Sequence, residues 1–137
     1  MNRPEYEFFN FFKKLNYFFS PNKINFVLES LISDPEFVVK RNTIIKNQNN
    51  LNIFLKKGNN LIISNLSNSK IIAEEETNIF IYNSFSGKIE SNSYVSLGLG
   101  SKIKGDIYCY SLTVNRPLFN KRKEVQFDGE LKMEKSS

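Results

Sequence analysis

The sequence contains no histidine, and its 137 residues include a single cysteine, Cys109. The absence of histidine removes the commonest general base and the commonest metal ligand in proteins. One cysteine excludes an internal disulfide framework, cannot supply the thiolates of a structural zinc site, and fits a reducing compartment. A phosphate-binding glycine loop is also missing. We therefore expect no enzyme activity, no metal and no cofactor.

Long hydrophobic runs are absent as well. No stretch approaches about 18 consecutive apolar residues, so no transmembrane helix is expected. The first residues include two acids and no unbroken apolar region, unlike a secretory signal, and we interpret the protein as cytoplasmic. The formal charge of +5 and the pI of about 9.3 are mildly basic. Basic residues are scattered, which is typical of ordinary solubility, is compatible with an anionic membrane surface, and argues against nucleic acid as a partner.

Apolar residues recur every 18 positions over most of the chain, and a fixed period of this length indicates a repeat architecture. Four columns of positions are apolar or small in successive repeats, and a fifth is shared by two residues. The columns are Ile53, Ile71, Ile89 and Ile107; Phe37, Leu55, Ala73, Ser91 and Cys109; Thr43, Leu61, Ile79 and Leu97; Ile45, Ile63, Ile81 and Leu99; and Phe85 with Ile103.

Within one repeat the apolar positions come in pairs two residues apart, such as Ile71 with Ala73. A spacing of two is typical of strands, whose alternate side chains share one face. The pattern predicts an all-β fold, a right-handed parallel β-helix of about five to six coils over residues 35–133. A left-handed helix of three hexapeptides per coil is the alternative. Asn47, Asn65 and Asn83 share another phase, which predicts an asparagine ladder between coils.

The period is interrupted near Pro117. Gly129 follows Gly105 by 24 positions, so we expect an insertion loop at about residues 115–124. Val125 and Phe127 nevertheless keep the spacing of 18 with Ile107 and Cys109, and the last strand could instead resume there. Residues 134–137 form a polar tail.

The N-terminal segment, residues 1–34, lacks the repeat and is rich in aromatic residues. Steps of three and four residues predict an amphipathic helix. Its apolar residues are Phe8, Phe9, Phe11, Phe12, Leu15, Phe18 and Phe19, beside the basic residues Lys13 and Lys14. Three interpretations stay open: the helix caps the first coil, lies in a membrane interface, or binds a partner protein.

The segments GKIESNSYVSLGLGSKIKGDIYCYSLTV and VQFDGELKM resemble the bactofilins, the polymer-forming cytoskeletal proteins of bacteria. The turn signature of that family matches Gly87, Gly105, Asp106 and Gly129. Serines and asparagines replace glycines of the earlier coils. The resemblance implies a compact right-handed β-helix that stacks end to end into unpolarised filaments without nucleotide. It also implies association with the inner face of the cytoplasmic membrane and a scaffolding role for cell-wall enzymes and cell shape.

The ends of such a solenoid are the candidate functional surfaces, because each end exposes strand edges and the core of its last coil. We expect a polymerisation interface formed by Phe127, Leu131 and Met133 at one end and Phe37 at the other. A non-polymerising adaptor that binds through its N-terminal helix is the alternative, and a hexapeptide-repeat acyltransferase is a remote one because it needs a catalytic base.

Other polar clusters are expected to be structural. Residues 74–76, three consecutive glutamates, read as a solvated corner, and residues 121–123, Lys-Arg-Lys, as a solvated loop. Asp106 belongs to the turn signature and is expected to have a structural role there. Cys109 shares a column of small residues, which predicts a buried, unreactive thiol.

Overall fold

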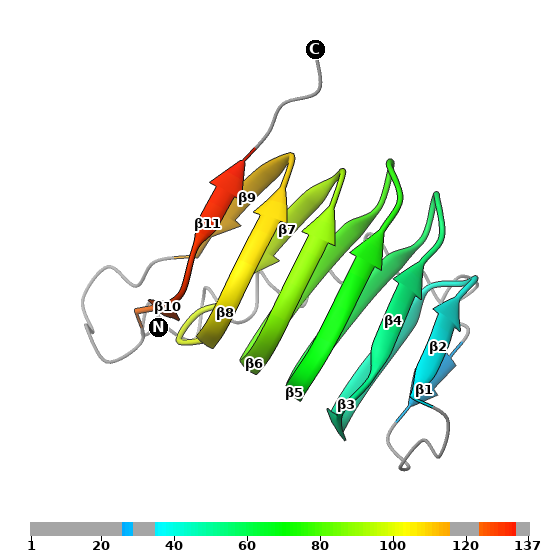
Figure 1. Ribbon diagram of the computed structural model, residues 1–137, viewed down its shortest axis with the longest axis horizontal. Coiled ribbons are helices and arrows are strands. Elements are labelled where there is room, and N and C mark those ends of the chain that lie inside the picture. The colour runs from blue at the N-terminus through cyan, green and yellow to red at the C-terminus, as the bar shows by residue number, and fades with distance from the viewer. Residues whose placement is uncertain (1–25, 29–34, 116–123, 134–137) are drawn as a thin grey trace, which may run out of the picture.

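The computed structural model describes residues 26–28, 35–115 and 124–133. These residues contain eleven strands, all in one parallel sheet, and no helix. Figure 1 shows the strands stacked side by side along one axis. The strands are β1 (Phe26–Leu28), β2 (Glu36–Val39), β3 (Thr43–Asn49), β4 (Asn52–Leu55), β5 (Asn60–Ala73), β6 (Asn78–Ser91), β7 (Tyr94–Leu97), β8 (Lys102–Cys109), β9 (Ser111–Val114), β10 (Gln126–Asp128) and β11 (Leu131–Met133).

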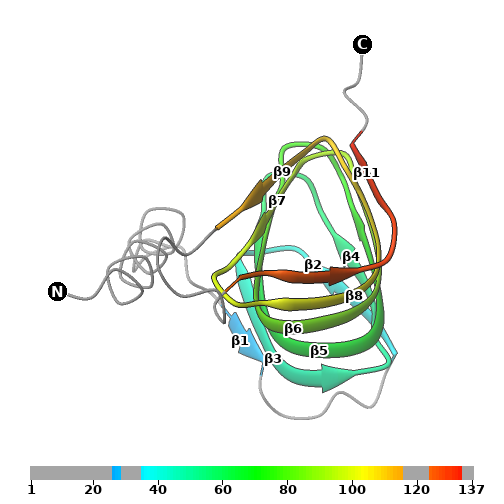
Figure 2. The ribbon, with the colours of Figure 1, turned by 90° about the vertical axis from the view of Figure 1, so that its left-hand side faces the viewer.

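The sheet winds into a three-sided solenoid, which Figure 2 shows in cross-section. One side, the back side, is the stack β1-β3-β5-β6-β7-β9. The front side stacks β2, β4, the later parts of β5, β6 and β8, and β11. The third side, the base, contains the bends of β5 and β6, the start of β8, and β10. The predicted all-β solenoid of parallel strands is therefore confirmed.

The pairing register along the back side gives the number of turns in the solenoid. Thr43 pairs with Leu61, Leu61 with Ile79, Ile79 with Val95, and Val95 with Leu112. The described chain thus makes four complete turns, with an incomplete turn at each end. Side chains of the predicted core columns point inward, where stacking removes them from water.

The isoleucine column is confirmed in full. Ile53, Ile71, Ile89 and Ile107 pair in successive coils, and none is more than 1% exposed. The pairs Leu61–Ile79 and Ile63–Ile81 also stack as expected and are buried. Phe85 and Ile103 share a column, with Leu66 below Phe85.

The predicted column positions of Leu97, Leu99 and Phe37 are wrong. One coil is 16 residues long along the back side, and another is 16 residues long along the front side. Ile81 pairs with Leu97, and Ile79 with Val95. Leu99 leaves the core for a corner, where the backbone amide and the hydroxyl of Ser101 both donate to the carbonyl of Gly98, at 3.1 and 2.8 Å. In the first coil Phe37 pairs with Ile53 instead of stacking with Leu55.

The last coil follows the spacing of 24. Phe127 pairs with Ile103, Leu131 with Ile107, and Met133 with Cys109. The insertion of six residues is therefore confirmed, and the alternative that keeps Val125 and Phe127 in the 18-residue phase is wrong. Residues 116–123, including the Lys-Arg-Lys run, and the tail at 134–137 lie outside the described residues.

A stack of glycines marks one corner between base and front. Gly87 lies over Ser69, Gly105 over Gly87, and Gly129 over Gly105, at φ of +134°, +134° and +151°. A Cβ at any of the three would lie within 1.8 Å of the carbonyl oxygen of the residue below. Asp106 beside this corner accepts a hydrogen bond from the Glu130 amide at 2.9 Å, which fits its expected structural role.

Asparagine ladders link the coils, but only partly as expected. The Asn65 amide donates to Asn47 Oδ1 at 3.2 Å, whereas Asn83 donates to Ser64 Oγ at 2.8 Å instead of to Asn65. These three asparagines adopt left-handed φ values between 54° and 72°, a conformation that asparagine tolerates better than most residues.

A second ladder was not foreseen. Asn60 Nδ2 donates to Asn42 Oδ1 at 3.3 Å, Asn78 Nδ2 donates to Asn60 Oδ1 at 2.9 Å, and all three side chains are partly buried. Each asparagine lies at the start of a back-side strand or just before it. The amides therefore tie three consecutive coils together.

Asn60→Ala is expected to lower the free energy of unfolding by about 1–2 kcal/mol, because two partly buried side-chain hydrogen bonds are lost. Asn52→Ala is the matched control, since that exposed amide makes no side-chain hydrogen bond within the described residues, and it should change stability by less than about 0.5 kcal/mol. Urea titrations followed by circular dichroism measure both. Equal losses for the two variants would show that the ladder contributes nothing.

Candidate functional site

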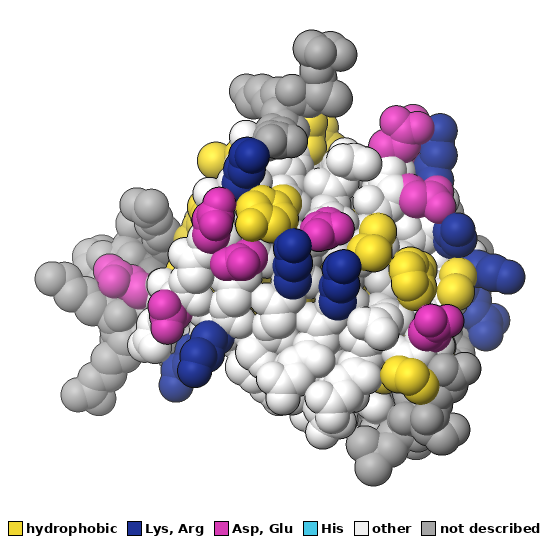
Figure 3. All heavy atoms as spheres, viewed as in Figure 1, with side chains coloured by type: hydrophobic (Ala, Val, Ile, Leu, Met, Phe, Trp, Pro, Cys, Tyr) yellow, Lys and Arg dark blue, Asp and Glu magenta, His cyan; other side chains and the backbone are white. Residues whose placement is uncertain are grey.

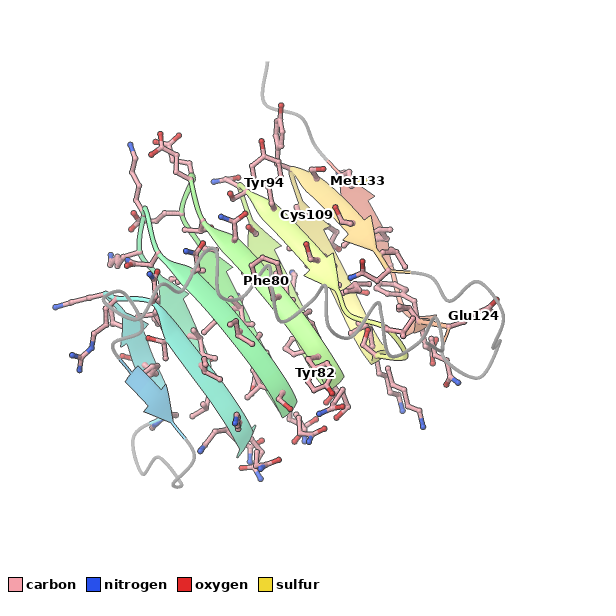
Figure 4. The ribbon with its side chains drawn as sticks, turned by 180° about the vertical axis from the view of Figure 1, so that it is seen from behind. Phe80, Tyr82, Tyr94, Cys109, Glu124 and Met133 are labelled. Atoms are coloured by element: carbon pink, nitrogen blue, oxygen red, sulfur yellow. The ribbon has the colours of Figure 1, made fainter. Side chains whose placement is uncertain are left out.

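The core of the solenoid is open at its C-terminal end. Ile107 and Cys109 are buried at 0% and 3% exposure, but Leu131 and Met133, which stack directly on them, are 41% and 55% exposed. Figure 4 shows Met133 next to Cys109 at this end. The two side chains occupy core columns and are exposed because no further described coil covers them.

Phe127 continues a second column at the same end. It lies over Ile103, is partly buried, and packs against the core with Leu112, Val114 and Val125. A hollow of about 290 Å³ lies among these side chains. Its lining is Leu97, Leu112, Val114, Glu124, Val125, Phe127 and Leu131. Six of the seven lining residues are apolar, so this hollow extends the apolar end surface.

Strand edges accompany the open core. Among the described strands β11 and β10 pair only with β8, and β9 pairs only with β7. Each of these strands therefore has a second backbone edge that no described strand occupies. Such an edge is a template for a strand of another chain. We define the C-terminal end surface as Leu112, Val114, Phe127, Leu131 and Met133.

The N-terminal end has a similar character. Strand β2 pairs only with β4 among the described strands, and Phe37 is a partly buried member of the Ile53 column. Val38 points outward from the same strand and is 43% exposed, whereas Val39 is buried. The structure thus places Phe37 at the opposite end from Phe127, Leu131 and Met133, as predicted.

The front side of the solenoid is mixed in character (Figure 3). Lys88 Nζ lies 3.0 Å from the Glu90 carboxylate and 5.2 Å from the centroid of the Tyr108 ring. This contact raises the pKa of Lys88 and lowers the pKa of Glu90, mainly through their hydrogen bond. Both groups are exposed to solvent, where such pairs contribute little stability.

The three consecutive glutamates form an ion-paired corner. Glu74 lies 3.2 Å from Lys56, and Glu75 lies 3.4 Å from Lys57, one coil below. The pKa of Glu74 is lowered because its carboxylate accepts a hydrogen bond from the Lys57 amide and another from Lys56. All of these side chains are about half exposed or more, which fits the expected solvated corner.

The buried nucleophilic side chains are engaged in structure. Ser93 Oγ donates to the Thr77 carbonyl and accepts from the Thr77 amide at 2.9 Å, while Ser69 Oγ accepts from the Leu51 amide at 3.1 Å. Cys109 is buried as expected, and burial raises the pKa of its thiol. Within the residues that the structure describes, no group of three Cys, Asp or Glu side chains could hold a metal ion.

The predicted N-terminal helix lies outside the described residues, with Phe8, Phe9, Phe11, Phe12, Leu15, Phe18, Phe19, Lys13 and Lys14. Within the described part of the chain, no helix is long and apolar enough to cross a membrane.

No protein-family model, curated protein or solved structure matches the chain. The two end surfaces are therefore the sites from which a function can be argued.

Proposed function

We propose that this chain is a non-enzymatic scaffold that assembles end to end into filaments, as its resemblance to the bactofilins implies. The observation that carries the proposal is the C-terminal end surface, where Leu131 and Met133 continue buried core columns and yet are 41% and 55% exposed. A second copy that stacks there would bury them as an additional coil does. The N-terminal end surface, which is strand β2 with Phe37 and Val38, offers a second site per subunit, and two sites per subunit permit an open filament.

The energetics favour such stacking. Burial of about 400 Å² on each partner gives roughly 20 kcal/mol of gross hydrophobic stabilisation at about 25 cal/mol per Å², most of it offset by the costs of association. Backbone edges of β9, β10 and β11 add directionality, because a partner strand can extend the sheet. Nucleotide has no part in this assembly.

We also infer that the solenoid is right-handed. In Figure 2 the C-terminal coil is nearest the viewer, and β8 runs along the base to the right before the chain rises and returns down along β9 on the left. The chain thus turns anticlockwise as it approaches the viewer, which supports a right-handed winding.

The cellular part of the proposal, a cytoplasmic scaffold on the inner membrane surface that serves cell shape and cell-wall enzymes, is supported by the resemblance alone.

Leu131→Arg is expected to abolish filaments, because it removes an apolar contact and places a charge in the interface. A loss of about 3 kcal/mol per contact lowers the association constant roughly a hundredfold. In unpolarised filaments like ends meet, so this variant should leave dimers joined through their N-terminal ends. Sedimentation and negative-stain electron microscopy of the full chain measure the effect.

Tyr94→Arg is the matched control for this experiment. Tyr94 is 51% exposed but lies on the back side, where its ring meets Tyr110 edge-on at 5.7 Å. This variant should assemble normally. Monomers from Leu131→Arg would indicate that unlike ends meet. A wild-type chain that stays monomeric at every concentration would favour the adaptor function instead.

A further inference from the structure

The back side carries an apolar row on its outer surface. Ile44, Ile62 and Phe80 pair across three successive strands, at positions that alternate with the core columns. Ile62 and Phe80 form a second apolar cluster, separate from the core, with Ile44 and Tyr82 packed against it. We call these four residues the back stripe. Figure 4 shows Phe80 and Tyr82 on this side of the molecule.

The back stripe is more deeply buried than an open sheet surface allows. Ile62 and Phe80 are each only 4% exposed, although they point away from the core. The front side offers a direct comparison, because Val38, Phe54 and Ile72 form an equivalent outward row there. Those side chains stay exposed or partly exposed.

The comparison shows that neighbours within a sheet surface do not by themselves bury an outward apolar side chain. The described residues packed on Ile62 and Phe80 are Ile44 and Tyr82, which belong to that same surface. Both sides belong to one copy of the chain. These described neighbours therefore do not account for the depth at which Ile62 and Phe80 are buried, and the back stripe needs additional cover.

The N-terminal segment is best placed to supply that cover. Twenty-five residues precede β1, and Val27 of β1 pairs with Ile44 of the back stripe, so the chain joins the solenoid beside it. A helix over residues 8–19 would be about 18 Å long. Three adjacent strands span about 10 Å between the first and the third, so such a helix can cross the whole row.

The alternative cover, the insertion at residues 116–123, is placed less well. It follows β9, and the outward positions that continue the row beyond Phe80 are Ser96 on β7 and Thr113 on β9, which are polar. The apolar row thus ends before it reaches β9. The row is apolar on the strands nearest β1, which is where the N-terminal segment joins the solenoid.

We propose that residues 8–19 form an amphipathic helix that docks its aromatic side on the back stripe. The helix then covers a side of the solenoid and leaves both end surfaces open. Its aromatic side chains are used within the protein, so they are not inserted in a membrane. This inference goes beyond the proposed assembly and can hold whether or not filaments form.

Hydrogen exchange of the full chain tests the proposal. In the wild type, amides of residues 8–19 should be protected, because an isolated helix of twelve residues is marginal in water and only docking makes it persist. Phe80→Asp should lower that protection at least tenfold and leave the amides of β5 to β8 protected. Phe54→Asp is the matched control, since it makes the same change on the outer front side, and it should leave residues 8–19 unaffected.

Three outcomes would overturn the proposal. Residues 8–19 could exchange at the rate of an unstructured chain in the wild type, or Phe80→Asp and Phe54→Asp could give the same profile. Protection that increases with protein concentration would show that a second copy covers the stripe. If Phe80→Asp also exposes the amides of β5 to β8, the milder Phe80→Ser replaces it, with the same expected loss at residues 8–19 alone.

Discussion

Gly105→Ala is expected to destabilise the solenoid by more than about 4 kcal/mol, a loss that few single substitutions reach. The added Cβ would lie 1.8 Å from the carbonyl oxygen of Gly87, whereas real Cβ atoms essentially never come within 3.0 Å of an unbonded heavy atom. That oxygen belongs to the backbone of the coil below, so it cannot rotate away as a side chain can. The φ of +134° adds strain for any residue with a Cβ.

Gly58→Ala is the control, because Gly58 also has a positive φ, of +82°, but has no atom within 4 Å of an added Cβ. It should cost only about 1–2 kcal/mol, the penalty of a left-handed conformation with a Cβ. Urea titrations followed by circular dichroism compare the two, both on the Leu131→Arg background, which removes filaments, and at one protein concentration, so that residual dimers affect both variants equally. If Gly105→Ala costs no more than Gly58→Ala, the coils are not stacked as tightly at this corner as the structure indicates.

Phe85→Ala is expected to cost about 3–5 kcal/mol, because it removes the largest fully buried side chain of the core and leaves a cavity. Phe85 lies between Leu66 below and Ile103 above, and Phe127 follows Ile103 in the same column. The cavity would open in the middle of the stack, where rigid coils on both sides limit collapse. The same urea titration measures the loss.

Phe54→Ala provides the matched control, since Phe54 has the same side chain on the outer front surface and is only partly buried. It should cost about 1–2 kcal/mol, the hydrophobic contribution of a half-buried phenylalanine. Similar losses for both phenylalanines would contradict the assignment of Phe85 to the core. A small loss for Phe85→Ala with an unchanged fold would show that the adjacent coils can close the gap.

The period of 18 was sufficient to predict the solenoid, because every coil must present apolar residues at the same inward positions. Ile53, Ile71, Ile89 and Ile107 are in register for this reason. The errors at Leu97 and Phe37 have one physical cause. A slip of two residues keeps a strand's inward side chains pointing inward, so the pattern hardly changes when a coil has 16 residues.

Corners determine coil length, and their geometry is hard to predict from sequence. Leu99 was assigned to the core because its spacing fitted, but the turn at Gly98 to Gly100 takes up residues that a fixed period assigns to a strand. The ladder through Asn60 was missed because asparagines are common throughout the chain and only the register shows which of them stack.

The end surfaces could be predicted from the sequence, but the back stripe was missed. Phe127, Leu131 and Met133 were identified because the repeat stops there. The stripe has its own signal in three-residue apolar runs, Leu61-Ile62-Ile63 and Ile79-Phe80-Ile81. Strands that are apolar on both surfaces are usually covered on both. The inward columns specify only the core surface of each strand, so they do not reveal an apolar outer surface.

Among the described strands, every pairing joins residues that are only 16 to 24 positions apart, from Glu36 with Asn52 to Gln126 with Lys102. Contacts this local in the sequence close short loops, which keeps the entropic cost of each step small. During synthesis, the strands of each new turn can therefore pair with those of the preceding turn soon after their residues emerge, before the rest of the chain is made. The molecule can be wound in the order in which it is made.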